Sequence, residues 1–385
     1  VKFNDPFYQS KRQLLFMFLG SITLLVCLIT PVHVWQKQSP YLLLIALLLV
    51  AAVLIPGLGR TVNGSTRWIP IGPLSLQPSE FAKIAIVVFM AGYLVRQQEE
   101  VRNNFSGFLK SLVVLGVFIV LFLLEPDFGA VVVMMGAVLG MFFLGGMRKR
   151  HISIVMLATV GFGTITILAA EYRYKRLISY LDPWADPFGT GYQLTQAQIA
   201  FGRGGWFGEG LGQSMQKLFY LPEAHTDFVY SVLAEEWGAF GAMVVVALYG
   251  VFIVRGLNVG QKAERSGRLF SAYLAYGVVL LIAAQAIINI GVNLGLLPTK
   301  GLTLPFVSYG GSSMLACAAS LGILLRISLE NSVTYGALKA ENDVHLELPY
   351  KTLDTLNTDL TPGLDDVDQW FVDDDKKQDW RHDKV

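Results

Sequence analysis

Apolar residues gather into nine long runs along the chain, separated by loops rich in glycine, proline and charged residues. About 20 apolar residues cross the hydrocarbon core of a bilayer, and most of the runs are near that length. Backbone groups in lipid must bond within their own segment, so each run is predicted to be a helix. The pattern predicts an all-α polytopic membrane protein with nine spans. The runs are residues 13–31, 41–56, 79–95, 108–124, 128–145, 152–170, 228–254, 269–291 and 310–328.

The composition also indicates a membrane protein. Of the 385 residues, 53% are hydrophobic and 15% are charged, whereas a soluble domain carries about 25% charged residues. Cys27 and Cys317 each lie inside an apolar run, so they offer neither a disulfide framework nor a zinc-type spacing. The chain begins with the polar stretch VKFNDPFYQSKRQ, in which no signal peptide is visible.

Lysine and arginine in short loops predict the orientation. The basic loops 145–151 and 255–268 are separated by two spans, and both are expected in the cytoplasm. Counting the spans from these two loops places loop 96–107 in the cytoplasm and the N-terminus outside. Because that is unusual without a signal sequence, we expect one further helix before Val1; the alternative is that one of the nine runs is misassigned. The loops expected outside are 57–78, 171–227 and 292–309.

The composition changes near residue 331. Residues 1–330 form the predicted membrane domain, and residues 331–385 are polar, acidic and without helical periodicity. Such a segment cannot bury enough apolar surface to fold alone, so it predicts a disordered cytoplasmic tail. The alternative is a docking segment for a partner.

The outward loop 171–227 is long enough to suggest a function. It opens with Arg173, Lys175 and Arg176 at the outer membrane boundary, where cations are disfavoured. They either extend to lipid headgroups or grip a phosphate-bearing lipid. The stretch YQLTQAQIA predicts one short amphipathic helix, and FGRGGWFGEGLG predicts a flexible or close-packed loop, because it fits no nucleotide-binding template.

Loops 57–78 and 292–309 share a pattern rich in proline and glycine, in RWIPIGPLSLQPSE and LLPTKGLTLPFVSYGGSS. The second motif includes Ser308 and Gly310. Such backbone is rigid and non-helical. Near membrane depth it is tolerated only when it is buried in protein or lines a wet cavity. We therefore expect both loops to wall one outward-facing cavity, although each could be an ordinary loop.

Ionisable residues gather at the outer third of the membrane. Charges within spans are expensive and usually functional. Asp227 stands where an apolar helix begins, and it is either a helix N-cap or a general base. His225 is either an ordinary loop residue or part of the same site. Lys83 either extends to the surface or faces the cavity, where we expect it to contact a carboxylate, Asp227 being the favoured one. The candidate site residues are Glu80, Lys83, Glu125, Asp127, Glu223, His225 and Asp227.

Four long motifs resemble those of the shape, elongation, division and sporulation (SEDS) family: NGSTRWIPIGPLSLQPSEFAK, LDPWADPFGTGYQLTQAQIAFGRGG, LPEAHTDF and GLLPTKGLTLPFVSYGGSS. The resemblance covers residues 5–330 and is closest to the cell-division branch rather than the elongation branch. It implies ten membrane helices with both ends in the cytoplasm. The first span seen here would match the second of the family.

The resemblance also implies a function, namely a peptidoglycan glycosyltransferase that polymerises lipid II at the outer face of the cytoplasmic (inner) membrane, at the division septum. The catalytic aspartate of the family falls on Asp227, which would take the proton of the attacking sugar hydroxyl. The pyrophosphate leaving group needs positive charge rather than a second acid, and a divalent cation could share that role. The candidate cations are Arg67, Lys83, Arg173, Lys175 and Arg176.

The partners implied by the resemblance are a class B penicillin-binding protein, which is a single-span transpeptidase, and other membrane proteins of the division machinery. Membrane lipid is expected, and nucleic acid is not. Two other function classes stay open. A lipid II flippase would carry polar groups at the membrane midplane, whereas the charges here lie towards the outer face. A non-catalytic scaffold would have no use for Asp227 at the mouth of a cavity.

Overall fold

The computed structural model describes residues 8–62, 65–72, 74–169, 171–299 and 301–356. The chain divides into two compact units, Val1–Asn331 and Ser332–Val385. The first unit contains the helices and the small sheet that build the candidate site, and the description below concerns that unit unless stated.

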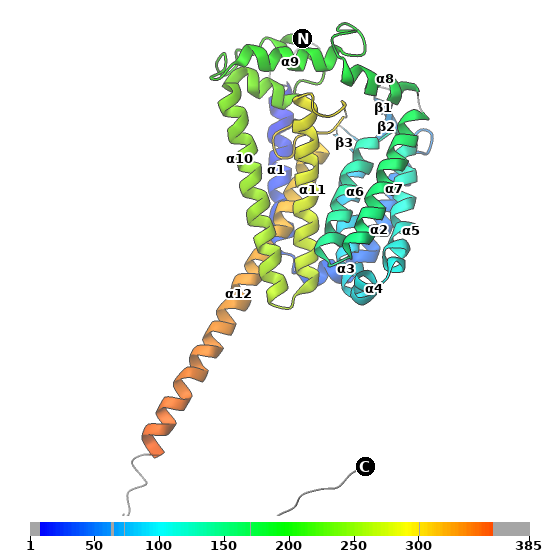
Figure 1. The fold of residues 1–385 in the computed structure, drawn as a ribbon. Helices are drawn as coiled ribbons and strands as arrows, with labels where there is room; N and C mark the ends of the chain where they lie inside the picture. Colours follow the sequence, from blue (N-terminus) through cyan, green and yellow to red (C-terminus); the bar gives the residue numbers. More distant parts are fainter. Residues whose placement is uncertain (1–7, 63–64, 73, 170, 300, 357–385) are drawn as a thin grey trace, which may run out of the picture. The chain divides into compact units, whose positions relative to one another are not determined.

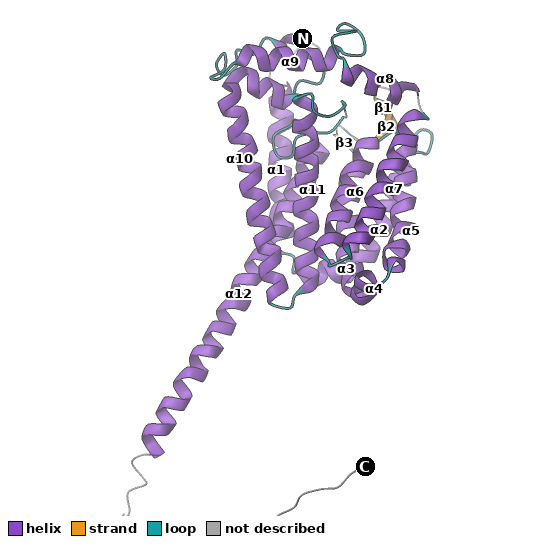
Figure 2. Ribbon diagram, viewed as in Figure 1, coloured by secondary structure: helices purple, strands orange, loops and turns teal. Residues whose placement is uncertain are grey.

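All nine apolar runs are helical within the described residues (Figures 1 and 2). Seven of these helices are long and apolar enough to cross a membrane, α6 is a shorter apolar helix, and α7 is not among the seven. The multi-pass helical fold is therefore confirmed, whereas nine spans stays a prediction. The helices are α1 (Tyr8–Ile29), α2 (Val32–Val53), α3 (Pro78–Arg96), α5 (Phe105–Leu124), α6 (Phe128–Leu144), α7 (Lys149–Leu168), α10 (Val229–Arg265), α11 (Leu269–Asn293) and α12 (Gly311–Leu356).

The loop between α2 and α3 is a small antiparallel sheet within the otherwise all-α fold. Its order is β1 (Arg60–Val62), β2 (Ser65–Ile71) and β3 (Leu74–Leu76). Arg60 pairs with Trp68, and Ile69 pairs with Leu76. The sequence predicted rigid, irregular backbone because its prolines and glycines disfavour regular structure. Strand pairing supplies hydrogen-bond partners for the backbone amides and carbonyls. It also fixes the backbone position of Arg67 in β2.

The long loop before α10 carries three short elements: α8 (Glu171–Leu181), α9 (Tyr192–Gly204) and a π-helix, η1 (Gln216–Tyr220). α9 confirms the short helix predicted from YQLTQAQIA. Figure 1 shows α8 and α9 at the same end of the helices as β1 and β2. A short connector, α4 (Gln98–Asn103), lies between α3 and α5.

The glycine-rich loop after α9 is packed tightly into a break in α10. At Gly238 the backbone leaves the helix (φ 70°, ψ −172°). The carbonyls of Glu235 and Glu236 there accept the amides of Glu209 (2.9 Å) and Gly210 (3.1 Å). On the other side of the break, the amides of residues 239 and 240 donate to the carbonyls of residues 205 and 206, at 2.8 and 3.2 Å. The close-packed alternative is therefore the one the structure adopts.

The carboxylates of Glu235 and Glu236 fasten this loop to α10. Glu235 is fully buried. Its carboxylate accepts hydrogen bonds from Ser214 Oγ, Met215 N and Gln216 N, and lies 3.5 Å from Arg203 Nε. Glu236 pairs with Lys217 at 2.5 Å. These two acids within an apolar run thus have a structural task, because a buried carboxylate is tolerated when it is fully hydrogen-bonded.

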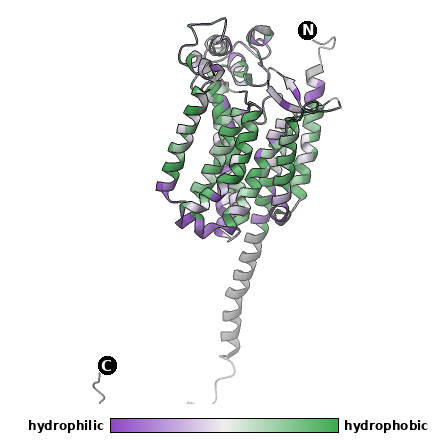
Figure 3. Cartoon of the chain, turned by 90° about the vertical axis from the view of Figure 1, so that its right-hand side faces the viewer, coloured by the Kyte–Doolittle hydropathy of each residue, from purple (hydrophilic) through white to green (hydrophobic). Residues whose placement is uncertain are grey.

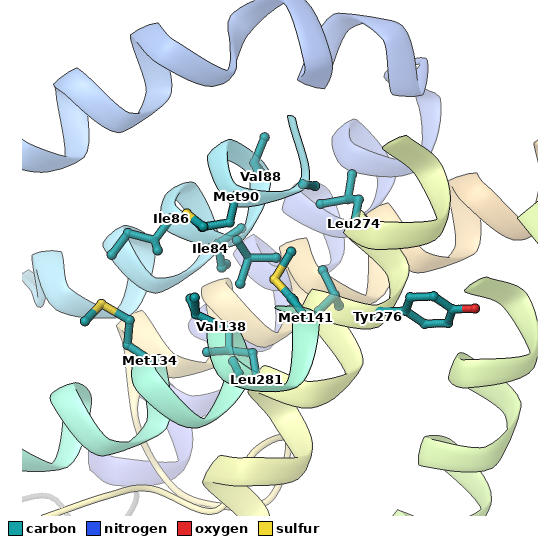
Figure 4. Close-up of a cluster of buried hydrophobic side chains, with 14 of the residues drawn as sticks. Ile84, Ile86, Val88, Met90, Met134, Val138, Met141, Leu274, Tyr276 and Leu281 are labelled. Atoms are coloured by element: carbon teal, nitrogen blue, oxygen red, sulfur yellow. The ribbon is translucent and has the colours of Figure 1, made fainter. Parts of the chain in front are cut away.

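The main hydrophobic core lies among α3, α6 and α11 (Figure 4). Met90, Val138 and Leu274 are fully buried there. A Cβ on Gly277 would lie 2.5 Å from a Val87 methyl carbon, so the helices approach closely at this glycine. Outward-facing positions are also apolar, and green hydrophobic residues cover the helices in Figure 3. Apolar residues inside and outside together are typical of a protein surrounded by lipid.

The helix α12 runs on to Leu356. Composition predicted the tail to begin near residue 331, and no helical period was recognised after that point. The structure describes helix as far as Leu356, and residues 357–385 lie outside the described part. Disorder of that last segment stays a prediction.

Candidate functional site

Asp227 lies in the loop that leads into α10 and is half-buried. The helix begins at Val229, its N-cap position is Phe228, and no side chain caps it. The N-cap alternative for Asp227 therefore does not describe this helix. The amide of Asp227 donates to the carbonyl of Glu223 at 3.1 Å, within a turn that Glu223 enters with a left-handed backbone (φ 55°). The carboxylate of Asp227 is thus carried by a tight turn rather than by a helix.

The loop between α11 and α12 holds the two carbonyls that precede Asp227. The amide of Tyr309 donates to the carbonyl of His225 at 2.9 Å. The hydroxyl of Ser308 donates to the carbonyl of Thr226, and accepts the amide of Leu304 at 2.8 Å. Ser308 is 4% exposed, so these hydrogen bonds are shielded from water. Of the predicted site residues, Ser308 thus holds the residue before Asp227, while His225 is held only through its carbonyl, by Tyr309, and its side chain is exposed.

Two asparagines of α11 hold the carbonyl of Asp227 itself. The side-chain amides of Asn289 and Asn293 each donate to this oxygen at 2.9 Å. Asn293 also accepts the amide and the hydroxyl of Ser231 at 3.0 and 2.7 Å. Asn289 also donates to the carbonyl of Leu302. Three successive carbonyls, at residues 225 to 227, are thus fixed, and this fixes the position from which the Asp227 carboxylate projects.

A third amide on the same face of α11 continues this polar row. Gln285, Asn289 and Asn293 are spaced four residues apart and are all buried, as expected for positions on one helix face. Gln285 donates to the carbonyl of Thr303 at 3.1 Å. Its own side-chain oxygen accepts Lys83 Nζ at 3.0 Å. The row therefore joins α3 to the segment that follows α11.

Lys83 does contact a carboxylate, but the acid is Glu80 rather than the favoured Asp227. Nζ of Lys83 lies 2.9 Å from Glu80 Oε1, one helical turn away on α3. Lys83 is 1% exposed, so the alternative in which it extends to the membrane surface is wrong. A buried cation needs a partner close by, and the i, i+3 spacing on a helix supplies one without any tertiary movement.

Arg67 of β2 clamps the turn between α5 and α6. Its Nε donates to the carbonyl of Glu125 at 3.1 Å, and its Nη2 donates to the carbonyl of Pro126. Nη1 lies 3.8 Å from Asp127 Oδ1. Asp127 is the N-cap of α6, accepting the amide of Ala130 at 3.1 Å. The turn is therefore held by a fixed cation on the sheet side.

Glu125 in the same turn is fully buried. Neither oxygen of its carboxyl group has a hydrogen-bond partner among the described residues. The pKa of Glu125 is raised from 4.5 to about 8, chiefly by burial and also by the nearby Asp127, while Arg67 opposes the shift. Because the charged form is disfavoured in an apolar place, this acid is mainly neutral at pH 7.

The side chains of Arg67 and Asp227 both lie close to Gly301. A Cβ atom on Gly301 would lie 3.5 Å from Asp227 Oδ2 and 3.8 Å from Arg67 Nη1. Loop 57–78 also contacts the start of α12, because the amide of Gln77 donates to Ser312 Oγ at 2.9 Å. The expected meeting of the two loops is thus observed, while a cavity enclosed by them stays a prediction. Two cavities of about 530 Å³ lie elsewhere, one lined by residues 95–100 and 103–104 and one along α8.

The remaining predicted residues lie around this centre or outside the description. The carbonyl of Gly310 accepts the amide of Met314 at 2.8 Å and so starts α12. Glu223 is exposed and accepts the hydroxyl of Thr226 at 2.9 Å. The side chains of Arg173, Lys175 and Arg176 on α8 lie outside the described part of the chain. Within the described residues, no three His, Cys, Asp or Glu side chains gather as metal ligands.

Sequence reasoning missed the amide row and Gly301. The signal for the row was present: three amide side chains at four-residue spacing within an otherwise apolar run, QAIINIGVN. Polar uncharged side chains in a span face the protein interior and bond there, so the spacing could have predicted one buried polar face. No comparable signal existed for Gly301, because the carboxylate and guanidinium beside it come from distant parts of the sequence.

Known proteins resemble the chain over most of its length. Residues 1–333 match the family described as cell cycle proteins, which includes FtsW, RodA and SpoVE. The chain is 50% identical over 341 residues to the probable peptidoglycan glycosyltransferase FtsW of Pseudomonas fluorescens, covering 89% of this chain and 84% of the relative. It is 53% identical over 327 residues to the protein of the same name from Hahella chejuensis, covering 85% and 82%.

Solved structures have the same fold. A chain from the structure described as "Structural coordination of polymerization and crosslinking by a peptidoglycan synthase complex" matches with a TM-score of 0.71 at 28% identity, covering 85% of this chain and 91% of that chain. The rod shape determining protein RodA of Thermus thermophilus matches with a TM-score of 0.62 at 27% identity, covering 85% and 89%.

Proposed function

The chain belongs to the SEDS family of FtsW, RodA and SpoVE proteins, and we infer that it is a peptidoglycan glycosyltransferase. Its substrate is lipid II, which it polymerises into glycan strands at the outer face of the cytoplasmic membrane during septal wall synthesis. The observation that supports this most is the placement of Asp227: a half-buried carboxylate on a turn whose three successive carbonyls are fixed by α11 and by the loop after it.

Asp227 acts as the general base. It takes the proton from the sugar hydroxyl of the incoming lipid II, and the hydroxyl oxygen forms a bond to the anomeric carbon of the growing chain. The bond between that carbon and the phosphate oxygen breaks, and the electron pair leaves with the polyprenyl pyrophosphate. The leaving group is already a stable anion, so no second carboxyl group is needed to protonate it. A base held rigidly within reach of the hydroxyl lowers the barrier because less reorganisation is required.

Arg67 is the cation that acts beside this base, and its position near Gly301 supports this role. Its guanidinium is anchored by the turn at residues 125–127, and Nη1 lies next to the same Gly301 position as the Asp227 carboxylate. A fixed positive charge there stabilises negative charge as it develops on the reacting oxygens. The ammonium group of Lys83 donates hydrogen bonds to Glu80 and Gln285. Lys83 therefore supports the site through Gln285 and does not contact the reacting atoms. Arg173, Lys175 and Arg176 bind the pyrophosphate of the lipid carrier.

The partner is a class B penicillin-binding protein that cross-links the glycan. The support is the likeness to a chain from a peptidoglycan synthase complex, whose description couples polymerization with crosslinking. The enzyme is a multi-pass protein of the cytoplasmic membrane, at the division septum, and other division proteins assemble with it.

Incubation of the purified full chain with lipid II in detergent, alone and with the transpeptidase, tests this function. Glycan strands are separated by gel electrophoresis. The wild-type chain should make strands, and Asp227→Asn should make none while it stays monodisperse, because the amide keeps the size of the carboxylate but cannot accept the proton. Strand synthesis by Asp227→Asn at the wild-type rate would refute the role of Asp227. Transport of lipid II across vesicle bilayers without strand synthesis would favour the flippase instead.

A further inference from the structure

Three large apolar side chains lie exposed on the glycine-rich segment between α9 and α10, residues 205–211, here called the aromatic loop. Trp206 is 71% exposed, Phe207 is 88% exposed and Leu211 is 71% exposed. Figure 1 shows this part of the chain beside the end of α10 that lies next to α9. Apolar side chains gathered on one exposed segment mark a surface that contacts a protein or a membrane.

The depth of the aromatic loop in the membrane follows from its contacts with α10. Exposed apolar side chains line this helix from Phe240 to Val254, and the charged Arg255 comes next, on the side predicted to be cytoplasmic. A hydrocarbon core of about 30 Å takes about 20 helical residues, so the core that begins at Arg255 reaches to about residue 235. The carbonyl of Trp206 accepts the amide of Phe240 at 3.2 Å. The first half of the aromatic loop therefore lies at the outer edge of the hydrocarbon layer.

Polarity changes along the aromatic loop in the same direction as depth. The amide of Glu209 donates to the carbonyl of Glu235, which lies about 6 Å nearer the outer surface than residue 239, at about 1.5 Å per residue. Glu209 is the charged residue of the aromatic loop, and Lys217 pairs with Glu236 at the same level of α10. The aromatic side chains thus branch from the deeper half of the loop and the carboxylate from the shallower half. This order is expected at a boundary between lipid and water.

The backbone of the aromatic loop is covered by α10. The carbonyls of Gly205 and Trp206 accept amides of that helix, and the amide of Gly208 donates to the carbonyl of Gly204 at 2.7 Å. A Cβ atom on Gly208 would lie 2.1 Å from the carbonyl oxygen of Glu236, so the loop and the helix are in direct contact. Irregular backbone near hydrocarbon is tolerated where protein covers it and supplies its hydrogen bonds. The aromatic loop meets this condition, and only its side chains extend outward.

We propose that the aromatic loop inserts the side chains of Trp206 and Phe207 into the outer leaflet of the membrane and anchors the broken helix α10 there. The loop is hydrogen-bonded to α10 on both sides of the break at Gly238, so the anchor holds both segments of the helix at one depth. The outer segment begins at Val229, two residues after Asp227. The anchor therefore also sets the height of that carboxylate relative to the lipid.

Spin labels on the full chain in lipid nanodiscs test the insertion. After replacement of Cys27 and Cys317, Trp206→Cys or Phe207→Cys carries a nitroxide, and its collisions with oxygen and with a water-soluble nickel chelate are compared. The ratio of oxygen to nickel collisions at either position should be about fivefold higher than at a label on Gln213, because oxygen concentrates in hydrocarbon and the chelate stays in water. Gln213 is exposed beyond the aromatic loop, and a label at Val251, on the exposed face of α10, gives the value for lipid.

Two results of the labelling would overturn the proposal. Ratios at positions 206 and 207 equal to the ratio at position 213 would place both side chains in water. Protection from the nickel chelate that appears only after the transpeptidase is added would assign the surface to a partner protein.

Hydrogen exchange in nanodiscs tests whether the insertion anchors α10. The double variant Trp206→Ser, Phe207→Ser should speed exchange of the amides of residues 239 and 240 about tenfold, because these amides are bonded to the loop and its release opens them. The matched control is Phe188→Ser in the segment between α8 and α9, since Phe188 is as exposed as Phe207. This control should leave the exchange unchanged. Wild-type exchange in the double variant would show that the loop holds the break without the membrane, and would overturn the anchor.

Discussion

Asn293 of α11 joins both sides of the turn that carries Asp227: its amide donates to the carbonyl of Asp227, and its oxygen accepts the amide of Ser231. The first partner is the last-but-one residue before α10, and the second lies within the first turn of that helix. One fully buried side chain thus sets the angle at which α10 meets its preceding loop.

Asn293→Ala should lower the rate of glycan synthesis ten- to a hundred-fold. Removal of the side chain leaves buried donors and acceptors unpaired, which costs about 1–3 kcal/mol for each buried group, and it frees the Asp227 turn. The pH profile of kcat distinguishes positioning from a purely structural role: the apparent pKa of the base should shift in the variant. An unchanged profile together with a merely lower folded fraction would show that Asn293 acts on stability alone.

Gly208→Ala should destabilise the outer half of α10. A Cβ at this position would lie 2.1 Å from the carbonyl of Glu236, and the backbone has φ of 80°. The loop must shift, and the carbonyls of the broken helix then lose their partners. We expect a loss of at least about 2 kcal/mol, the usual range for a strained non-glycine backbone with lost hydrogen bonds. Thermal unfolding in detergent measures this, with Gly202→Ala as the control.

Glu125→Gln should change how stability depends on pH. The pKa of Glu125 is raised from 4.5 to about 8 in the folded protein, chiefly by burial and then by Asp127. A raised pKa means that the acid favours folding fully below about pH 4.5, and that this contribution is lost as pH rises through 8. Glutamine cannot ionise. The variant should therefore unfold at a temperature similar to wild type at pH 5 and at a higher temperature at pH 9.

One result of the measurement at pH 9 would contradict this prediction. A Glu125→Gln protein that is no more stable than wild type at pH 9 would show that Glu125 ionises without penalty. A nearby residue of the same turn provides the control: Asp127→Asn removes a negative charge that accepts hydrogen bonds from Ser79 and Ala130, so it should destabilise.

Cysteine labelling tests the orientation. After replacement of Cys27 and Cys317, a cysteine at Gln213 should react with a membrane-impermeant maleimide in intact cells whose outer layers have been permeabilised. A cysteine at Ser266 should react only after lysis. Both positions are exposed, so protection reports the side of the membrane rather than burial. Reaction of both before lysis would show that the basic loop 255–268 is not cytoplasmic.

The helices of this protein were predictable, and the interior of the site was only partly so. Hydrophobic runs identify spans because lipid imposes one requirement on every residue in them. Asp227 stood out as an acid at the start of such a run, whereas Arg67 was a candidate cation and Ser308 a member of an outward loop motif. The partner of Lys83 was predicted wrongly, because charge and depth alone do not distinguish an acid on the same helix from one across the bundle.

Other parts depend on contacts that no local pattern reports. The sheet at β1–β3 forms from segments whose prolines argue against strands, and pairing decides the outcome. Glu235 and Glu236 are acids inside a span, where charges usually serve function, yet in this fold they hold a loop in place. Their partners lie about 20 residues earlier in the chain, in the loop that covers the break at Gly238.

The order of these contacts along the chain determines when the enzyme becomes competent during synthesis. The loop that seals the break in α10 precedes that helix, so the buried Glu235 meets its partners as soon as α10 is made. The groups that fix Asp227 come later, from α11 and from Ser308 and Tyr309. A nascent chain that ends before residue 309 therefore carries the base without its supports. If Asp227 is the base, as proposed, glycan synthesis should begin only after the start of α12 has been made.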